Sequence, residues 1–160
     1  MLRDSTSSSS REVRRTVKLE LDEREAADTA SKEKELTLQL TDPADPLFFY
    51  SLTLTESDFG ALRRQQGLIV DFAQFPAMIT KLADKCSSPT DGKFYLVLES
   101  ESASSSLNFQ EVNDFRHLCH LSLRVCRGSD SQVREYLASC VRRLQTESRT
   151  AEEALRIYLN

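Results

Sequence analysis

The sequence predicts a mainly β fold with some helix, a β-sandwich or flattened barrel that carries an inserted pair of helices and ends in a long helix. Several short segments alternate apolar and polar residues with the period of a strand, and two segments of helical period interrupt them. Residues 129–160 contain neither glycine nor proline. At 160 residues with 39% hydrophobic content, the chain is long enough for one core.

The first part of the chain predicts three strands. Residues 1–10 are rich in serine and offer little to bury, so we expect a disordered tail there and a head domain over residues 11–128. The second strand alternates cleanly, and the third is more apolar and so more central. The predicted strands are residues 12–23, 35–42 and 47–55, with Leu36, Leu38 and Leu40 on one face of the second.

Two helices are predicted after the third strand. The segment "TESDFGALRRQQG" has a capping residue, Thr55 or Ser57, and stops at Gly67. The segment "PAMITKLADKC" has helical spacing of its apolar residues, with Pro76 at a favoured first-turn position. The helical pair is therefore inserted between strands.

Three more strands and a long helix complete the chain. In the last strand, alternation predicts one apolar face, and residues 129–160 predict a helix capped by Ser129 or Ser131. Its seam weakens at Glu147 or Ser148, so we do not expect a stable coiled coil within these residues. The strands are residues 93–100, 107–112 and 117–126, and the apolar face of the last consists of His117, Cys119, Leu121, Leu123 and Val125.

Charge and composition exclude several classes of protein. The net charge is −4, with 21 basic and 25 acidic residues and no basic stripe, so we expect no nucleic-acid partner. The longest apolar run is far shorter than the ~20 residues of a membrane span, and the serine-rich start is no secretory signal. We therefore expect a cytosolic protein without a membrane partner. The four cysteines have irregular spacing, which predicts reduced and mostly buried thiols.

The cluster His117, Cys119 and His120 predicts neither a metal site nor a thiol enzyme. On a strand, His120 faces away from the other two, and the chain offers no second ligand pair with zinc-type spacing. A catalytic cysteine needs an activated thiol, whereas the face that carries Cys119 is otherwise apolar. We expect no metal, no cofactor and no enzyme activity.

Two features remain as candidate sites. In "QQGLIVDFAQFP", residues 65–76, Leu68, Val70 and Phe72 alternate toward the core. Phe115 follows two turn-forming residues, Asn113 and Asp114, and precedes Arg116, which predicts a loop tip or strand entry. Composition leaves two alternatives for Phe115: it folds back onto the core, or it is exposed for a partner.

The order of these motifs resembles that of the spindle assembly abnormal proteins, whose heads build the centriolar cartwheel. The resemblance covers roughly residues 12–142 and is carried by "SDFGALRRQQGLIVDFAQFP" and by "NDFRHLCHLSLRVCRGSDSQVREYLASC". It implies a head similar to those of the end-joining repair scaffolds. It also implies a weak head-to-head homodimer in which a loop residue, here Phe115, enters an apolar pocket of the other head.

For this chain the resemblance implies a self-associating structural scaffold of the centriole, basal body or a related flagellar or apical cytoskeletal structure. Asn113, Asp114 and Arg116 would flank the contact, and other centriolar or basal-body proteins would be partners. We infer that the pocket is walled by Leu68, Val70, Phe72 and Phe75. The alternative function is a protein- or DNA-binding head of a DNA-repair scaffold.

The chain departs from the cartwheel pattern at its C-terminus, because it ends soon after the head instead of continuing into a long coiled coil. It is then either the head of a longer protein or the short, tail-less relative known from flagellates and apicomplexans. The serine-rich start favours the relative. An isolated head is expected to form pairs, not rings.

Overall fold

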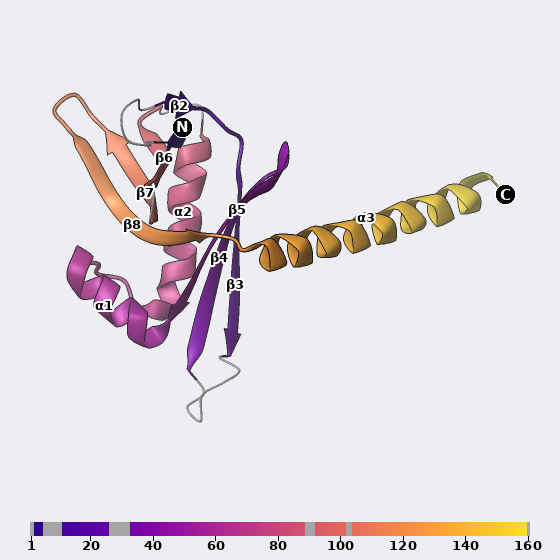
Figure 1. The fold of residues 1–160 in the computed structure, drawn as a ribbon, viewed down its shortest axis with the longest axis horizontal. Coiled ribbons are helices and arrows are strands. Elements are labelled where there is room, and N and C mark those ends of the chain that lie inside the picture. The colour runs from indigo at the N-terminus through magenta and orange to yellow at the C-terminus, as the bar shows by residue number, and fades with distance from the viewer. Residues whose placement is uncertain (1, 5–10, 26–32, 89–91, 102–103, 160) are drawn as a thin grey trace. The chain divides into compact units, whose positions relative to one another are not determined.

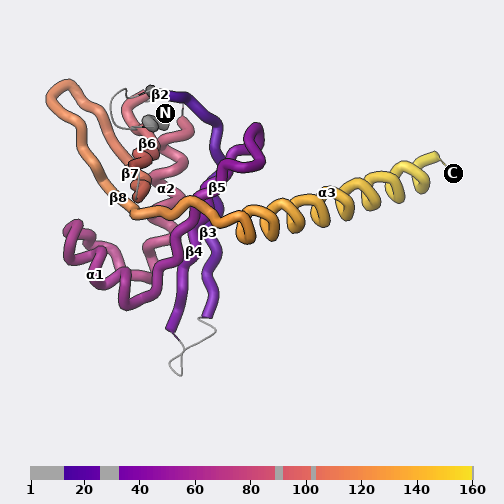
Figure 2. Tube along the Cα trace, viewed as in Figure 1, coloured from indigo at the N-terminus to yellow at the C-terminus, as the bar shows by residue number. Residues whose placement is uncertain are grey.

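The computed structural model describes residues 2–4, 11–25, 33–88, 92–101 and 104–159. It contains two compact units, Met1–Arg127, which we call the head, and Gly128–Asn160. Figure 2 follows the chain from one terminus to the other.

The head is built on one antiparallel sheet of six strands, shown in Figure 1. Its strands fall into two halves, β3-β4-β5 and β8-β7-β6; among the described residues, β5 and β8 pair at Tyr50–Arg127 and Ser51–Cys126. This confirms the predicted mainly β fold with inserted helices. The strands are β3 (Lys18–Glu25), β4 (Lys34–Asp42), β5 (Asp45–Thr55), β6 (Phe94–Ser100), β7 (Ser105–Val112) and β8 (His117–Arg127).

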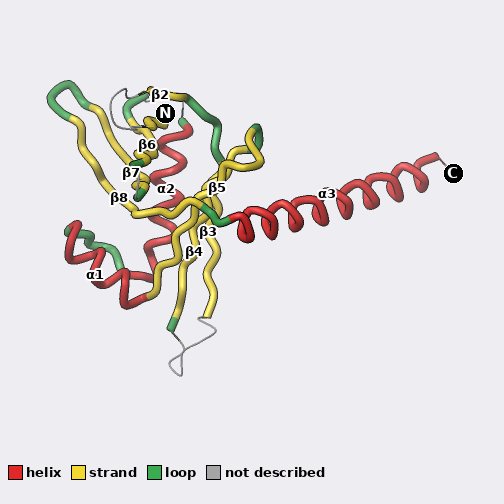
Figure 3. Tube along the Cα trace, in the orientation of Figure 1, coloured by secondary structure: helices red, strands yellow, loops and turns green. Residues whose placement is uncertain are grey.

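Along the chain, the two predicted helices follow β5 and precede β6; Figure 3 shows them in red. Thr55 caps the first, because its hydroxyl accepts from the backbone N–H of Asp58 at 3.1 Å while the Asp58 carboxylate accepts from the Thr55 N–H. Gly67 ends this helix with φ of 64°, a left-handed conformation that glycine adopts without a steric penalty. The helices are α1 (Glu56–Gln66) and α2 (Phe75–Ser87), separated by the short 3-10 helix η1 (Phe72–Gln74).

The core lies where both halves of the sheet meet the helical pair. As predicted, the apolar face of β4 is buried, and it joins residues from β6, β7 and β8 in a single cluster. The helices contribute aromatic side chains, with the ring centroids of Phe59 and Phe75 4.7 Å apart. Because both halves of the sheet contribute side chains to one core, the halves stay together although β5 and β8 pair at two positions of the described residues. Fully buried members include Leu38, Leu40, Phe75, Ile79, Leu98, Leu107 and Phe109.

The N-terminal strands differ from the prediction. The predicted strand over residues 12–23 is two strands, β2 (Arg11–Val13) and β3, because β2 pairs with β1 (Leu2–Asp4) whereas β3 pairs with β4. β1 lies beside β6. β1 lies within residues 1–10, so the expected disorder is wrong for residues 2–4. Two strands can pair through backbone hydrogen bonds without burying their side chains. The rest of that segment, residues 1 and 5–10, lies outside the described residues.

A β-bulge in β8 overturns part of the predicted apolar face. Phe109 pairs with Leu121 and Gln110 with Cys119, so His120 is an extra residue opposite a single step of β7. The bulge shifts the alternation of side chains by one position. Leu121 and the apolar residues that follow are buried as predicted, but His117 and Cys119 are exposed.

The second unit is the helix α3 (Asp130–Leu159). Ser129 caps it as predicted: its hydroxyl accepts from the N–H of Gln132 at 3.3 Å, and the Gln132 side chain accepts from the Ser129 N–H at 2.9 Å. Within the described ranges, neither α3 nor another helix has an apolar stretch long enough to cross a bilayer.

Candidate functional site: an exposed phenylalanine and an apolar cavity

Phe115 occupies the tip of the hairpin between β7 and β8, and its side chain is 95% exposed. This excludes the alternative in which it folds back onto the core. Leaving a whole phenylalanine ring in water is unfavourable by roughly 1.5–3 kcal/mol relative to burial. A ring held in this position is therefore well suited to insertion into another surface.

The hairpin tip is held by the side chain of Asn113. Its Oδ1 accepts hydrogen bonds from the backbone N–H groups of Phe115 and Arg116, both at 2.9 Å. The Asn113 N–H in turn donates to the Arg116 carbonyl at 3.1 Å. Such an Asx turn replaces missing backbone bonds and restricts the loop. The predicted flanking residues Asn113, Asp114 and Arg116 thus form the turn that presents Phe115.

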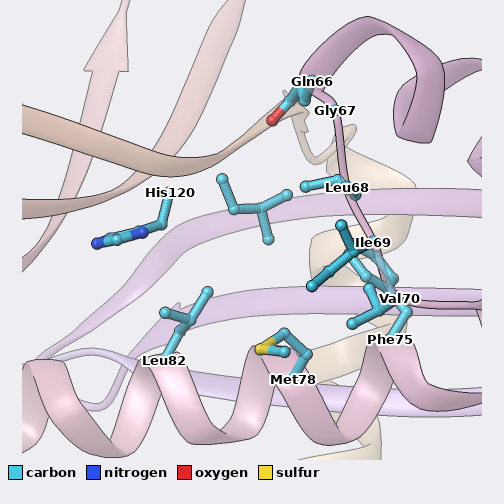
Figure 4. A pocket seen from close by; sticks show the side chains of 10 residues that line it. Gln66, Gly67, Leu68, Ile69, Val70, Phe75, Met78, Leu82 and His120 are labelled. Carbon is cyan, nitrogen blue, oxygen red and sulfur yellow. The ribbon is translucent and has the colours of Figure 1, made fainter.

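An apolar cavity of about 260 Å³ lies elsewhere on the head, between the segment after α1, one face of α2, and β8. Apolar cavities of ~150 Å³ are known to hold benzene, so this one has room for a phenylalanine ring. In Figure 4 the segment after α1 forms one wall and α2 the floor. The lining residues are Gln66, Gly67, Leu68, Ile69, Val70, Phe75, Met78, Leu82, His120 and Leu121.

The wall after α1 is fixed by Arg63. The Arg63 side chain donates to the carbonyl of Leu68 at 3.2 Å and to the carboxylate of Asp71 at 3.1 Å. The Arg63 carbonyl accepts from the N–H of Leu68 at 3.0 Å. These bonds hold the segment in the extended form that turns Leu68 and Val70 inward and leaves Ile69 90% exposed at the rim.

Three of the four predicted pocket residues line this cavity, namely Leu68, Val70 and Phe75. Phe72 packs toward the core as predicted, but outside the cavity, because η1 turns its ring against Phe59 at a centroid distance of 5.6 Å. Sequence reasoning missed Met78 and Leu82 as lining residues. A signal existed, since Phe75, Met78 and Leu82 follow the i, i+3, i+7 spacing of one helix face.

His120 gives the cavity a polar end. Its Nε2 lies 2.8 Å from a carboxylate oxygen of Glu111, and its ring stacks on Phe94 at 5.9 Å between centroids. The ammonium of Lys85 lies 5.0 Å from the centroid of the same Phe94 ring. The sequence pattern placed His120 on the face opposite His117 and Cys119 but did not indicate the cavity, because the bulge positions it there.

The cysteines are unpaired but not buried as predicted: Cys119 and Cys126 are exposed, and Cys86 and Cys140 are half-buried. Although Cys119 as a residue is exposed, its Sγ lies against the strand, 3.5 Å from the Leu121 carbonyl, and burial raises the pKa of this thiol. A raised pKa is the opposite of what activates a nucleophile. Within the described part of the chain, no group of three potential metal ligands gathers.

The fold and site define a β-rich head domain with an inserted helical pair, an exposed aromatic tip and an apolar cavity. The sequence profile of the centriolar protein SAS N-terminal domain matches residues 1–125, and the chain belongs to this family. It is 41% identical over 150 residues to the spindle assembly abnormal protein 6 homologue of Xenopus laevis, and 40% identical over 131 residues to that of Danio rerio. These alignments cover 89% and 77% of this chain, respectively.

The chain spans about a fifth of the length of these relatives, 22% and 21%. The fold is also similar to a solved N-terminal fragment of Leishmania SAS-6 that contains part of its coiled coil domain. The TM-score is 0.83 at 23% identity, over 98% of this chain and 85% of the fragment. The matches favour the centriolar family over the alternative of a DNA-repair head.

Proposed function

We propose that this chain is the head of a centriolar structural protein that assembles by pairing with a second copy of itself. The observation that carries the proposal is the coexistence of an exposed Phe115 and an apolar cavity of about 260 Å³ on one head. Family membership supports a role in the cartwheel of the centriole or basal body. Other centriolar proteins would be further partners.

Phe115 cannot fill the cavity of its own head. Phe115 lies in the turn that precedes β8, whereas Leu121, in the cavity wall, is the fifth residue of that strand. The four strand steps from His117 to Leu121 extend over roughly 13 Å, and Phe115 is 95% exposed, so its ring does not occupy this cavity. A second copy can supply the ring, and in a two-fold contact each copy donates one Phe115 and receives one.

The contact is expected to be weak. Two buried phenylalanine rings contribute about 3–6 kcal/mol, whereas loss of translational and rotational freedom costs ~4–15 kcal/mol. Neighbouring contacts such as the exposed Ile69 at the cavity rim offset part of this cost. We expect such neighbouring contacts to bring the dissociation constant to tens to hundreds of micromolar, so stable assembly depends on linking many copies.

The test is Phe115→Glu, measured by sedimentation equilibrium of the 160-residue chain in concentrated solution. Pairing is expected to vanish while the melting temperature stays unchanged, because the exposed ring contributes little to its own core. The conservative variant Phe115→Leu is the matched control and should retain part of the affinity. Pairing of Phe115→Glu at wild-type strength would refute the proposal.

A further inference from the structure

Gln66, the last residue of α1, forms two hydrogen bonds with the backbone of one residue in β8. Its Nε2 donates to the carbonyl of Ser122 at 2.6 Å, and its Oε1 accepts from the Ser122 N–H at 2.9 Å. Two opposed bonds of this kind are what one residue of a neighbouring strand makes in an antiparallel pair. The side-chain amide therefore takes the place of a strand residue at this point of β8.

The two bonds from Gln66 satisfy backbone groups of Ser122 that no neighbouring strand reaches in the described part of the chain. In the described part of the chain, β5 pairs with β8 only at Arg127 and Cys126, so Ser122 faces no strand on that side. Ser122 lies between the buried residues Leu121 and Leu123. Without Gln66, its N–H and carbonyl would be poorly satisfied, which costs free energy in a half-buried position.

The same two bonds join opposite walls of the apolar cavity. Gln66 begins the wall that continues through Leu68 and Val70, and Ser122 adjoins Leu121 in the facing wall. Figure 4 shows Gln66 and Gly67 where the segment after α1 meets the strand. In the sequence the bonded residues are 56 positions apart. Among the described residues, these two hydrogen bonds connect the two walls directly.

Hydrogen bonds continue from Ser122 to side chains of β7. The hydroxyl of Ser122 donates to Oδ1 of Asn108 at 2.6 Å, and Nδ2 of Asn108 lies 3.3 Å from the hydroxyl of Ser106. Asn108 is buried, with 6% of its surface exposed. A chain of satisfied polar groups in a buried position holds its members in one geometry. Movement of Gln66 is thus opposed by β7 as well as by β8.

We propose that Gln66 is a positioning residue that sets the separation of the two cavity walls, and thereby the affinity with which the cavity accepts Phe115 of a second copy. The proposal rests on the head pairing proposed above. Gln66 itself offers only an amide at the end of the cavity, so its effect on affinity is exerted through Leu68, Val70 and Leu121.

The variant that tests this is Gln66→Glu, which keeps the length and shape of the side chain. The carboxylate can still accept from the Ser122 N–H, but it has no donor for the Ser122 carbonyl and repels it. Gln65→Glu is the matched control, because it makes the same change of charge at the exposed neighbouring position. Both are compared with wild type in the 160-residue chain.

Three quantities are measured by NMR: hydrogen exchange of the Ser122 amide, methyl shifts of Leu68, Met78 and Leu121, and the dissociation constant of pairing. For Gln66→Glu we expect faster exchange at Ser122, shifted cavity methyls and pairing weakened about tenfold, with amides of β4 still protected. Gln65→Glu should leave all three unchanged. Rapid exchange at Ser122 with wild-type methyl shifts and pairing would overturn the proposal.

Gln66→Met and the Phe115→Glu variant distinguish failure of this proposal from a loss of folding and from failure of the proposed function. If Gln66→Glu also loses the protection of β4, Gln66→Met repeats the test without a charge, and global unfolding there would show that Gln66 serves the fold and not the cavity. If Phe115→Glu pairs like wild type, the proposed function fails. The methyl shifts of unpaired heads then still decide whether Gln66 sets the cavity.

Discussion

The side-chain oxygen of Asn113 accepts a hydrogen bond from the backbone N–H of Phe115 at 2.9 Å, and a second from Arg116 at the same distance. One side chain thus fixes the backbone on both sides of the exposed ring. A loop that is ordered before binding loses less conformational entropy on binding.

Asn113→Ala is therefore expected to weaken head pairing by about 2- to 12-fold, as loss of ~0.5–1.5 kcal/mol implies. The melting temperature should change little, because the turn is exposed. Asn113→Asp retains the acceptor and should pair nearly as wild type does, which sedimentation of both variants can check. Equal pairing of Asn113→Ala and wild type would show that the loop needs no ordering.

Arg15 provides a prediction for stability. Its guanidinium donates to the carboxylates of Asp42 and Asp45 at 3.1 and 3.0 Å, and the Asp42 side chain is only 6% exposed. Arg15→Ala removes the ion pair of this carboxylate and leaves it the hydrogen bond from the Ala44 N–H, so the free energy of unfolding should fall by roughly 1–3 kcal/mol. Arg14→Ala, at the exposed neighbouring position, is the control in urea denaturation; equal losses would contradict the role of the ion pair.

Glu33 predicts a dependence on pH. Its carboxylate accepts from the hydroxyl and the N–H of Ser57, in the first turn of α1, and these bonds lower the pKa of Glu33 below its ordinary value of 4.5. A lowered pKa stabilises the fold above the unfolded-state pKa, and the contribution is lost as the pH falls through the folded-state value. Glu33→Gln should therefore lower the melting temperature at neutral pH, with a difference that disappears in acid. The exposed control Glu25→Gln should show no such trend.

The weak seam of α3 predicts that residues 129–160 do not form a tight dimer by themselves. The apolar side chains Val141, Leu144 and Leu155 are exposed, but Glu147 or Ser148 occupies the seam between them. Stable two-stranded coiled coils favour Leu, Ile or Val at such positions. A peptide of these residues should sediment as a monomer at low micromolar concentration, and Glu147→Leu should promote dimers. A wild-type dimer at that concentration would contradict the prediction.

Local sequence determined the kind of nearly every element and many of its ends. Thr55, Gly67 and Ser129 act through hydrogen bonds and backbone preferences that reach only a few residues, so their helix limits could be predicted. The turn at Asn113 is local in the same sense. The exposure of Phe115 followed from that turn together with the family resemblance.

Tertiary structure alone decided the bulge at His120, the division of the first strand and the formation of the cavity. The bulge depends on the register between β7 and β8, and a change of one residue in register exposes His117 and Cys119. The cavity and the bonds from Gln66 to Ser122 unite segments 56 positions apart. Periodicity reveals which face of a segment is apolar. It does not reveal which distant surfaces meet, because that depends on close packing of the whole core and on hydrogen bonds for the polar groups buried there.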